Sequence, residues 1–248
     1  MFGFFSYNKN IRNIVVLFGT VFNDISVRRL KADGTTEREF KVPIAYGPTE
    51  KFLAKLNQTV TGDIGGIVLP RMSFEITDYS YDATRKLQTT KKFKKVKSGS
   101  TTDLTTVYNP VPYDFNITLS IMVKYSDDGT QILEQILPYF TPEFQVTMNE
   151  LATMGIKRDI PIILESVTTE DTYEGEFITR RALIHTLVFT VKGYIYGRTP
   201  DQGIIREVDV NIGANFNDQK DVNIDIKPDP ITADADDAFG FTETITDL

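Results

Sequence analysis

The chain carries few of the side chains that most often catalyse reactions or bind metals. It contains a single histidine, His185, and no cysteine. Cysteine-based triads and thiolate or histidine-rich zinc sites are therefore not available here. His185 falls in an alternating apolar run, on the same strand face as Leu187 and Phe189. We interpret it as a histidine of the core or of an interface, and we expect no metal and no cofactor.

Paired carboxylates and glycines are the remaining candidates for chemistry. Asp127 adjoins Asp128, and Asp236 adjoins Asp237. Glycosidase-type acid–base work needs two carboxylates that face each other across a cleft, which adjacency does not establish. The first pair suits the start of a helix, and the second lies in a polar tail. The glycines of TGDIGGIV (61–68) lack the Lys and Ser/Thr of a phosphate-binding loop, so they indicate a turn.

The charges are unevenly distributed along the chain. The net charge is −7, which disfavours a sequence-wide affinity for the nucleic-acid backbone. Residues 85–97 nevertheless hold seven bases and no acid, whereas residues 229–248 hold six acids and no base. We expect four lysines to meet an acidic partner surface or DNA, and a merely solvated loop is the alternative. They are Lys91, Lys92, Lys94 and Lys95.

Length and composition suit an ordinary globular chain. Its 248 residues correspond to one or two domains, and 41% of them are hydrophobic. No apolar run is long enough for a signal peptide or a membrane span. We predict one domain over 1–226, from which residues 88–110 project as a loop or hairpin, and an acidic C-terminal tail over 227–248.

The elements that would position these residues can be predicted from apolar periodicity. Apolar residues spaced by three and four predict a helix over 11–25, and shorter helices follow Pro48 and begin near 126–128. Alternation over 113–125 predicts a strand with one buried face. Asp33-Gly34 predicts a hairpin turn. Further strands are expected at 67–79, 144–148, 160–167, 182–196, 204–212 and 222–226. The fold class is therefore α+β, with a mostly antiparallel sheet flanked by a few helices.

Two segments are candidates for contacts with partner proteins. Phe4, Phe5 and Tyr7 precede the first helix and supply aromatic area of the kind found at interfaces. Val222, Ile224 and Ile226 alternate with polar residues, so residues 221–226 can form an edge strand. That strand would either join a neighbour's sheet or complete the sheet of its own subunit, and the sequence leaves both alternatives open.

The chain resembles a known family over most of its length. The resemblance rests on FGTVFNDI (18–25), VPIAYGPTEKFL (42–53), LPRMSFEITDYSYDATRKL (69–87), VPYDFNITLSIMVKYSDDGTQILEQILPYFTPEF (111–144) and GYIYGRTPDQGIIREVDVNI (193–212). In their order these segments are similar to the tail sheath stabilizer, or tail completion, family of T-even-type contractile-tailed bacteriophages.

The resemblance implies a structural protein without a catalytic motif. It implies a fold related to phage tail terminators and a hexameric ring at the head-proximal end of the tail. Such a ring caps the tube and the sheath and offers a platform for the neck and head. The implied partners are further copies of the chain, the sheath protein, the tube or tube-terminator protein and neck proteins, with DNA passing through the lumen and no membrane.

The implied location is the virion tail, after assembly in the host cytoplasm. Another tail or neck component, such as a tube or connector protein, is the first alternative. A monomeric binding module and a carboxylate-based hydrolase are the others.

Overall fold

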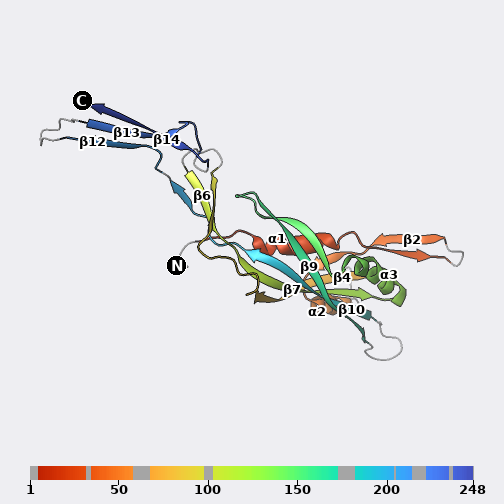
Figure 1. Cartoon of the computed structure of the whole chain (residues 1–248). Helices are drawn as coiled ribbons and strands as arrows, with labels where there is room; N and C mark the ends of the chain where they lie inside the picture. Colours follow the sequence, from red (N-terminus) through yellow and green to blue (C-terminus); the bar gives the residue numbers. More distant parts are fainter. Residues whose placement is uncertain are drawn as a thin grey trace. The chain divides into compact units, whose positions relative to one another are not determined.

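The structure, a computed structural model, describes residues 5–31, 35–57, 68–97, 103–172, 182–203, 205–213, 222–234 and 237–247 (Figure 1). The chain divides into two compact units. The large unit consists of residues 9–86 and 111–195, and the small unit consists of residues 1–8, 87–110 and 196–248. This division rests on internal contacts, and the expected limits of the domain (1–226) and the tail (227–248) remain predictions.

A six-stranded sheet forms the centre of the large unit. Its strand order is β3-β4-β7-β10-β9-β8, and only the β3–β4 pair is parallel among the described strand pairs. The mostly antiparallel sheet is thus confirmed. The strands are β3 (Ile44–Tyr46), β4 (Arg71–Tyr81), β7 (Val111–Val123), β8 (Glu143–Leu151), β9 (Ile156–Thr172) and β10 (Ala182–Ile195).

Alternating side chains explain why β7 lies in the middle of this sheet. Phe115, Ile117 and Leu119 occupy every second position and are fully buried. On β10 they lie opposite Val191, Phe189 and Leu187, in that order. Strands buried between two neighbours and under helices favour such β-branched and aromatic residues. The strand predicted over 113–125 is therefore confirmed, although β7 begins and ends two residues earlier, at Val111 and Val123.

Helix α1 (Asn10–Val21) covers one face of this sheet with its apolar stripe. Ile14 and Phe18 are one turn apart and fully buried. The predicted helix is confirmed, but it ends before residue 25. Asn23 and Asp24 are weak helix formers, and Ile25 leads into a strand, where its carbonyl accepts the N–H of Val42.

A glycine allows α1 to lie close to the sheet. A Cβ atom at Gly193 on β10 would come within 2.8 Å of Phe115 Cε2 and 2.9 Å of Ile14 Cδ1. Because overpacking forces side chains and backbone to shift, Gly193→Ala is expected to lower the free energy of unfolding by about 1–3 kcal/mol. Denaturant unfolding measures this loss. Gly197→Ala is the control, since nothing lies within 4 Å of its Cβ. Equal stability of the two variants would contradict the close approach.

A hairpin, two more α-helices and a short 3-10 helix complete the large unit. They are β1 (Ser26–Leu30), β2 (Thr36–Lys41), α2 (Thr49–Asn57), α3 (Ser126–Ile136) and a short 3-10 helix (Leu137–Tyr139). The hairpin is confirmed, although Asp33-Gly34 lies outside the described residues. The side-chain amide of Gln131 accepts a hydrogen bond from the N–H of Arg28 and donates one to its C=O, each at 3.0 Å. The amide of Gln135 makes the same pair of hydrogen bonds with the N–H (3.4 Å) and the C=O (2.8 Å) of Ser26. Two glutamines four residues apart on α3 thus cover the outer edge of β1.

The small unit contains two three-stranded sheets with the orders β11-β6-β5 and β12-β13-β14. The strands are β5 (Lys92–Val96), β6 (Asp103–Tyr108), β11 (Asp201–Gly203), β12 (Val208–Ile212), β13 (Val222–Asp229) and β14 (Gly240–Asp247). Residues 88–110 therefore contain a pair of antiparallel strands. Strand β14 lies in the segment that the sequence indicated as an acidic tail.

Candidate interaction surfaces

The segment before α1 exposes its aromatic side chains. Phe5 is 95% exposed and Tyr7 is 58% exposed, and Phe4 lies outside the described residues. The side-chain amide of Asn8 donates hydrogen bonds to the carbonyls of Tyr196 (3.2 Å) and Gly197 (2.5 Å). The segment is thus attached to the small unit just before α1 begins, while its aromatic rings face solvent.

The lysines singled out in the sequence lie on or beside strand β5. Lys91 precedes the strand, Lys92, Lys94 and Lys95 lie within it, and all four are exposed. The Lys92 ammonium lies 4.7 Å from the centre of the Tyr108 ring on the neighbouring strand. The ring face attracts this ammonium, so the contact helps to hold the Lys92 side chain against β6. The predicted partner contact itself remains a prediction.

The next lysine along β5 is already paired within the chain. Lys97 Nζ lies 2.6 Å from Asp201 Oδ2, which joins the end of β5 to β11. The hydrogen bond to Asp201 raises the pKa of Lys97. The hydrogen bonds from Lys97 and Thr105 lower the pKa of Asp201. This lysine therefore helps to hold the sheet together and is a weaker candidate for an external contact.

The strand that contains Val222, Ile224 and Ile226 is the central strand of its sheet. Strand β13 pairs with β12 on one side and with β14 on the other. The prediction that residues 221–226 form an edge strand is therefore wrong. The structure has the alternative arrangement, in which this segment completes the sheet of its own subunit. The reason is β14, whose alternating Phe, Thr, Glu and Ile residues supply a second partner for the backbone of β13.

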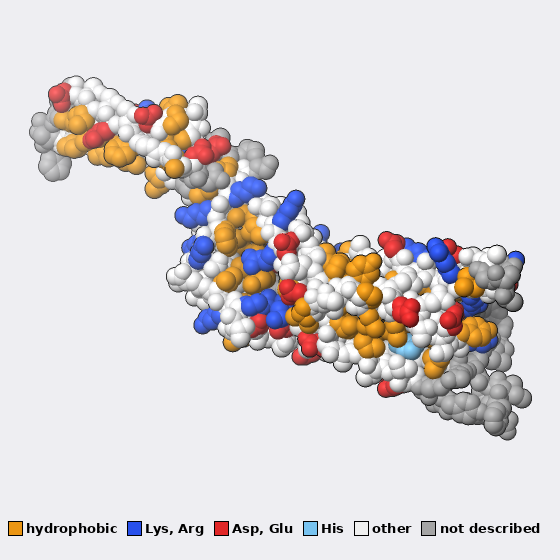
Figure 2. All heavy atoms as spheres, turned by 45° about the vertical axis from the view of Figure 1, so that its right-hand side comes forward, with side chains coloured by type: hydrophobic (Ala, Val, Ile, Leu, Met, Phe, Trp, Pro, Cys, Tyr) orange, Lys and Arg blue, Asp and Glu red, His pale blue; other side chains and the backbone are white. Residues whose placement is uncertain are grey.

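One face of this sheet carries accessible apolar side chains in its middle, bordered on β14 by Glu243 and Asp247. Ile224 lies between Val210 on β12 and Ile245 on β14, so these three side chains share a face. Val210 is 40% exposed and Ile245 is 62% exposed. Hydrophobic side chains gather along this sheet in Figure 2. Exposed apolar side chains that lie together can mark a contact surface. Contacts through the side chains of Val222, Ile224 and Ile226 therefore remain a prediction, whereas a contact through the backbone of this strand is no longer predicted.

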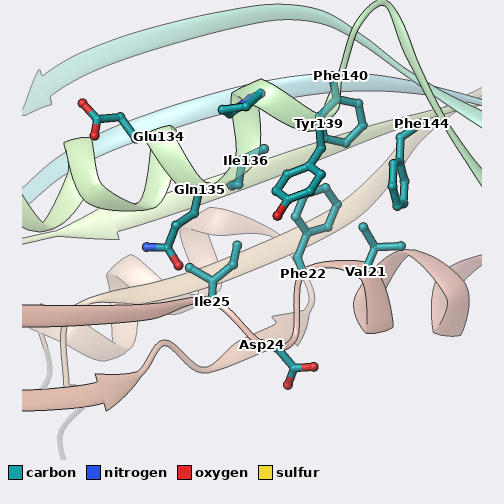
Figure 3. A pocket seen from close by; sticks show the side chains of 11 residues that line it. Val21, Phe22, Asp24, Ile25, Glu134, Gln135, Ile136, Tyr139, Phe140 and Phe144 are labelled. Carbon is teal, nitrogen blue, oxygen red and sulfur yellow. The ribbon is translucent and has the colours of Figure 1, made fainter.

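The large unit has an aromatic pocket where the C-terminal ends of α1 and α3 meet the 3-10 helix and the start of β8 (Figure 3). Its volume is about 500 Å³. Eleven residues line it, and seven of these carry Val, Ile, Tyr or Phe side chains: Val21, Phe22, Ile25, Ile136, Tyr139, Phe140 and Phe144. The Phe22 and Phe140 rings lie nearly parallel at 6.2 Å, and Tyr139 is 66% exposed. The carboxylates of Asp24 and Glu134 lie at its periphery.

Sequence reasoning missed this pocket. Its aromatic residues come from two segments far apart in the chain, around residue 22 and over 139–144. The run LPYFTPEF (137–144) carried a signal, since three aromatics directly follow an amphipathic helix. Periodicity assigns such residues to a core or to a surface, but it does not show that they surround an unfilled space.

The paired carboxylates have separate roles. Helix α3 begins after Tyr125 and has no side-chain cap, so capping by Asp127 or Asp128 is wrong. Asp128 is buried instead, and its Oδ2 lies 2.8 Å from Arg29 Nη2. The hydrogen bond to Asp128 raises the pKa of Arg29. Asp236 lies outside the described residues. Asp128 therefore links α3 to the hairpin, whereas Asp127 accepts a hydrogen bond from the Gln131 amide at 2.7 Å within α3.

The single histidine lies in the core, as one of its two interpretations predicted. His185 is 6% exposed, and its Nδ1 lies 2.9 Å from Thr169 Oγ1 on β9. Burial lowers the pKa of His185. Within the described ranges, no three His, Cys, Asp or Glu side chains are grouped as a metal site would need. The helices of those ranges are also too short or too polar to cross a membrane.

His185 should make stability depend on pH near neutrality. Its folded pKa lies below the unfolded value of 6.5, so the unfolded chain takes up a proton first as the pH falls. The associated stability is complete above about pH 6.5 and is lost below it, by at most about 1.4 kcal/mol per pH unit. Urea unfolding between pH 7.5 and 5.5 measures this slope. His185→Gln should flatten it, and an unchanged slope in that variant would contradict the assignment.

Comparison with known proteins identifies the family. A family model described as the tail sheath stabiliser of T4-like viruses of the Myoviridae matches residues 5–247. The chain belongs to this family. Tail completion protein gp15 of Enterobacteria phage T4 is 35% identical over 230 residues, which cover 89% of this chain and 83% of that protein. The family resemblance inferred from the sequence is confirmed.

Membership in the tail sheath stabiliser family gives these surfaces a context. The chain is a structural protein of the tail of a contractile-tailed bacteriophage, and it is located in the virion. Structural proteins of this kind act through contacts with other proteins. The exposed aromatics, the basic strand, the apolar sheet face and the aromatic pocket are therefore the candidate functional features of this tail sheath stabiliser.

Proposed function

We propose that this tail sheath stabiliser forms a hexameric ring at the head-proximal end of the phage tail. The ring caps the tail tube and the contractile sheath and provides the attachment platform for the neck and head. The observation that carries the proposal is the family match over residues 5–247, which includes both units and every candidate surface. Assembly of the ring in the host cytoplasm precedes its incorporation into the virion.

The proposed partners follow from this position. Each copy contacts two further copies in the ring, and the ring contacts the sheath protein, the tube or tube-terminator protein and neck proteins. DNA passes through the lumen without sequence-specific binding. A closed ring requires two different patches on each subunit, one for each neighbour. Several separate exposed surfaces on one chain, rather than a single one, support such an arrangement.

Mass and position in the tail test the proposal. The purified full chain is measured by size-exclusion chromatography with light scattering and is viewed by electron microscopy. A ring of six has six times the 28.1 kDa of one chain. Tails labelled with an antibody to the chain should then carry label at the head-proximal end alone. Label along the whole tail would indicate a tube protein, and a chain that is monomeric both alone and on tails would refute the ring.

The basic strand provides a further prediction about partners. Changing Lys91, Lys92, Lys94 and Lys95 to Glu should weaken tail completion, because these exposed ammonium groups face an acidic protein surface or DNA. Exposed charges are screened beyond about 8 Å at physiological ionic strength, so the wild-type contact should also weaken as salt rises. The fraction of complete tails by electron microscopy measures the effect, and Gln variants separate charge from shape. Normal completion by the Glu variant would show that the lysines are only solvated.

A further inference from the structure

We infer that strand β5 of one subunit pairs through its free edge with strand β14 of a second copy of the same chain. This inference rests on the proposed function, since the ring supplies the second copy. Each subunit gives its β5 to one neighbour and its β14 to the other. The contact therefore joins two different patches, as a closed ring requires.

Both strands are the last strand of a sheet. Among the described strands, β5 pairs only with β6, and β14 pairs only with β13. The outer edge of each strand therefore offers backbone N–H and C=O groups to a further strand. An extended segment added to such an edge gains main-chain hydrogen bonds, and its alternate side chains determine the register.

The sequence of β5 places cations on both sides of an aromatic residue. In KKFKK (91–95), Lys91 and Lys95 lie two residues before and after Phe93, so all three side chains belong to one face. Lys91 directly precedes β5, and its carbonyl accepts the N–H of Asn109, which continues the pairing. The Lys91 ammonium lies 5.5 Å from the centre of the Phe93 ring, in agreement with a shared face.

The sequence of β14 has the opposite charges at the same spacing. In ETITD (243–247), Glu243 and Asp247 lie two residues before and after Ile245 and share its face. Antiparallel pairing that puts Ile245 opposite Phe93 puts one acid opposite each lysine. Opposite charges across a strand pair are stabilising, as is an aromatic residue across a β-branched one. Among the described residues, no ion pair occupies these acids or these lysines.

The same register joins apolar residues of two sheets into one row. Phe93 lies opposite Val107 on β6. Ile245 lies opposite Ile224 on β13, which lies opposite Val210 on β12. Pairing of β5 with β14 therefore extends one apolar row across five strands of two subunits. It also covers part of Ile245, which is 62% exposed in the single chain.

The charges disfavour pairing of either edge with itself. Two copies of β5 would bring lysines together, and two copies of β14 would bring carboxylates together; like charges directly opposite each other are destabilising. Lysines protect many sheet edges from unwanted pairing in this way. They leave an acidic strand as the favoured partner of β5, and the chain itself contains such a strand in β14.

A chain cannot make this pairing with its own strands in one open sheet. In the order β11-β6-β5, β11 lies on the side away from the free edge of β5. Adding β14, β13 and β12 at that edge would put β12 five strand spacings from β11, or about 24 Å. Only residues 204–207 join Gly203 at the end of β11 to Val208 at the start of β12, and this connection extends to about 18 Å at most. The partner strand therefore belongs to another copy.

Charge exchange between two full-length variants tests the contact. The lysine variant carries Lys91→Glu with Lys95→Glu, and the acid variant carries Glu243→Lys with Asp247→Lys. Each variant alone has like charges at the contact, so the dissociation constant between its subunits should rise about tenfold or more. An equimolar mixture should recover assembly, because a ring of six that alternates the two variants pairs every β5 with a β14 of opposite charge. Sedimentation over a dilution series measures assembly.

A matched control changes the same charges on the other face of β5. Lys92→Glu with Lys94→Glu gives the same net charge as the lysine variant, but in the proposed register these positions lie opposite Thr246 and Thr244. Its mixture with the acid variant should not recover assembly. The melting temperature of the dissociated subunit, measured by circular dichroism, should be the same in the lysine and acid variants as in the natural chain, because their altered side chains are exposed.

A pair of cysteines tests the register without charge reversal. The natural chain has no cysteine. One full-length chain carries Lys95→Cys and another carries Glu243→Cys, and oxidation of the assembled mixture should link the two chains into a dimer on a non-reducing gel. The control replaces Glu243→Cys by Thr244→Cys, because a shift of one residue moves the side chain to the other face. The control mixture should link at least tenfold less.

The outcomes separate this contact from the ring itself. Rings that form normally from either charge variant alone, or without preferential linking of the first cysteine pair, overturn the contact and leave the proposed function intact. Normal assembly of the acid variant would assign the lysines to another anionic partner. If a chain with all four charge changes recovers assembly but the mixture does not, the strands pair within one chain, which overturns the second copy. Natural chains that form no ring, alone or on tails, overturn the proposed function itself.

Discussion

Replacing Phe18 with alanine is expected to lower the free energy of unfolding by about 3–5 kcal/mol. Phe18 is fully buried on α1, and its ring lies 5.2 Å from that of Phe74 and 5.3 Å from that of Phe189. Its loss leaves a cavity between α1 and two strands of the central sheet, and close-packed neighbours refill such a cavity only in part. Because native proteins are stable by only about 5–15 kcal/mol, this substitution removes a large share of the total.

Thermal unfolding followed by circular dichroism measures this effect. The melting temperature should fall by roughly 6–20 °C for a chain of this length. Phe5→Ala is the matched control, since it makes the same change at a side chain that is 95% exposed and should alter stability by less than about 0.5 kcal/mol. Equal effects of the two substitutions would contradict the position of Phe18 in the core. Loss of the subunit fold would also remove every contact proposed for the tail.

Elements with a strong apolar period were predictable from the sequence. The alternation in β7 and the three- and four-residue spacing in α1 reflect burial of one face, and burial is what selects apolar residues. The sequence also predicted β10, where Leu187, Phe189 and Val191 occupy alternate positions. In each case the side chains are buried by the same sheet, so local pattern and tertiary packing agree.

Elements held by backbone pairing alone were missed. Strand β14 is exposed along its whole length and carries Glu243 and Asp247, so its composition resembled that of a polar tail. Its Thr and Ile residues favour strands, yet its place is determined by the free backbone of β13. The short parallel strand β3 was not predicted as a separate element. Val42-Pro43 separates it from β2, and its register with β4 depends on a distant segment.

The residues predicted to contact partners differ in where the structure places them. Phe5, Tyr7 and the four lysines of β5 are exposed, as contact residues of a free subunit should be. The β13 residues were predicted to pair through their backbone with a neighbouring subunit. In the structure, both edges of that strand are already paired within the chain. The aromatic pocket depends on how α3 packs beside α1. The sequence of either helix alone does not determine that packing.

Replacing Arg158 with methionine is expected to lower the free energy of unfolding by about 3–5 kcal/mol, because it removes the cation beside a buried carboxylate. Glu150 lies at an irregularity in the β8–β9 ladder, its side chain is fully buried, and its Oε2 lies 3.2 Å from Arg158 Nε. The Arg158 guanidinium also lies 4.1 Å from the centre of the Tyr194 ring on β10. Denaturant unfolding measures the loss, and Arg158→Lys, which keeps the charge, should lose less.

The double variant Glu150→Met with Arg158→Met shows which part of this arrangement matters. If the loss in the single variant comes from a buried carboxylate without the Arg158 cation, removal of the carboxylate should restore most of the stability. Replacing both partners of a buried ion pair by apolar groups is often close to neutral, whereas removing one is costly. If the double variant is as unstable as Arg158→Met alone, the loss comes instead from the missing contact with Tyr194. In that case the ion pair contributes little, and the stacked guanidinium is what joins β9 to β10 at this end of the sheet.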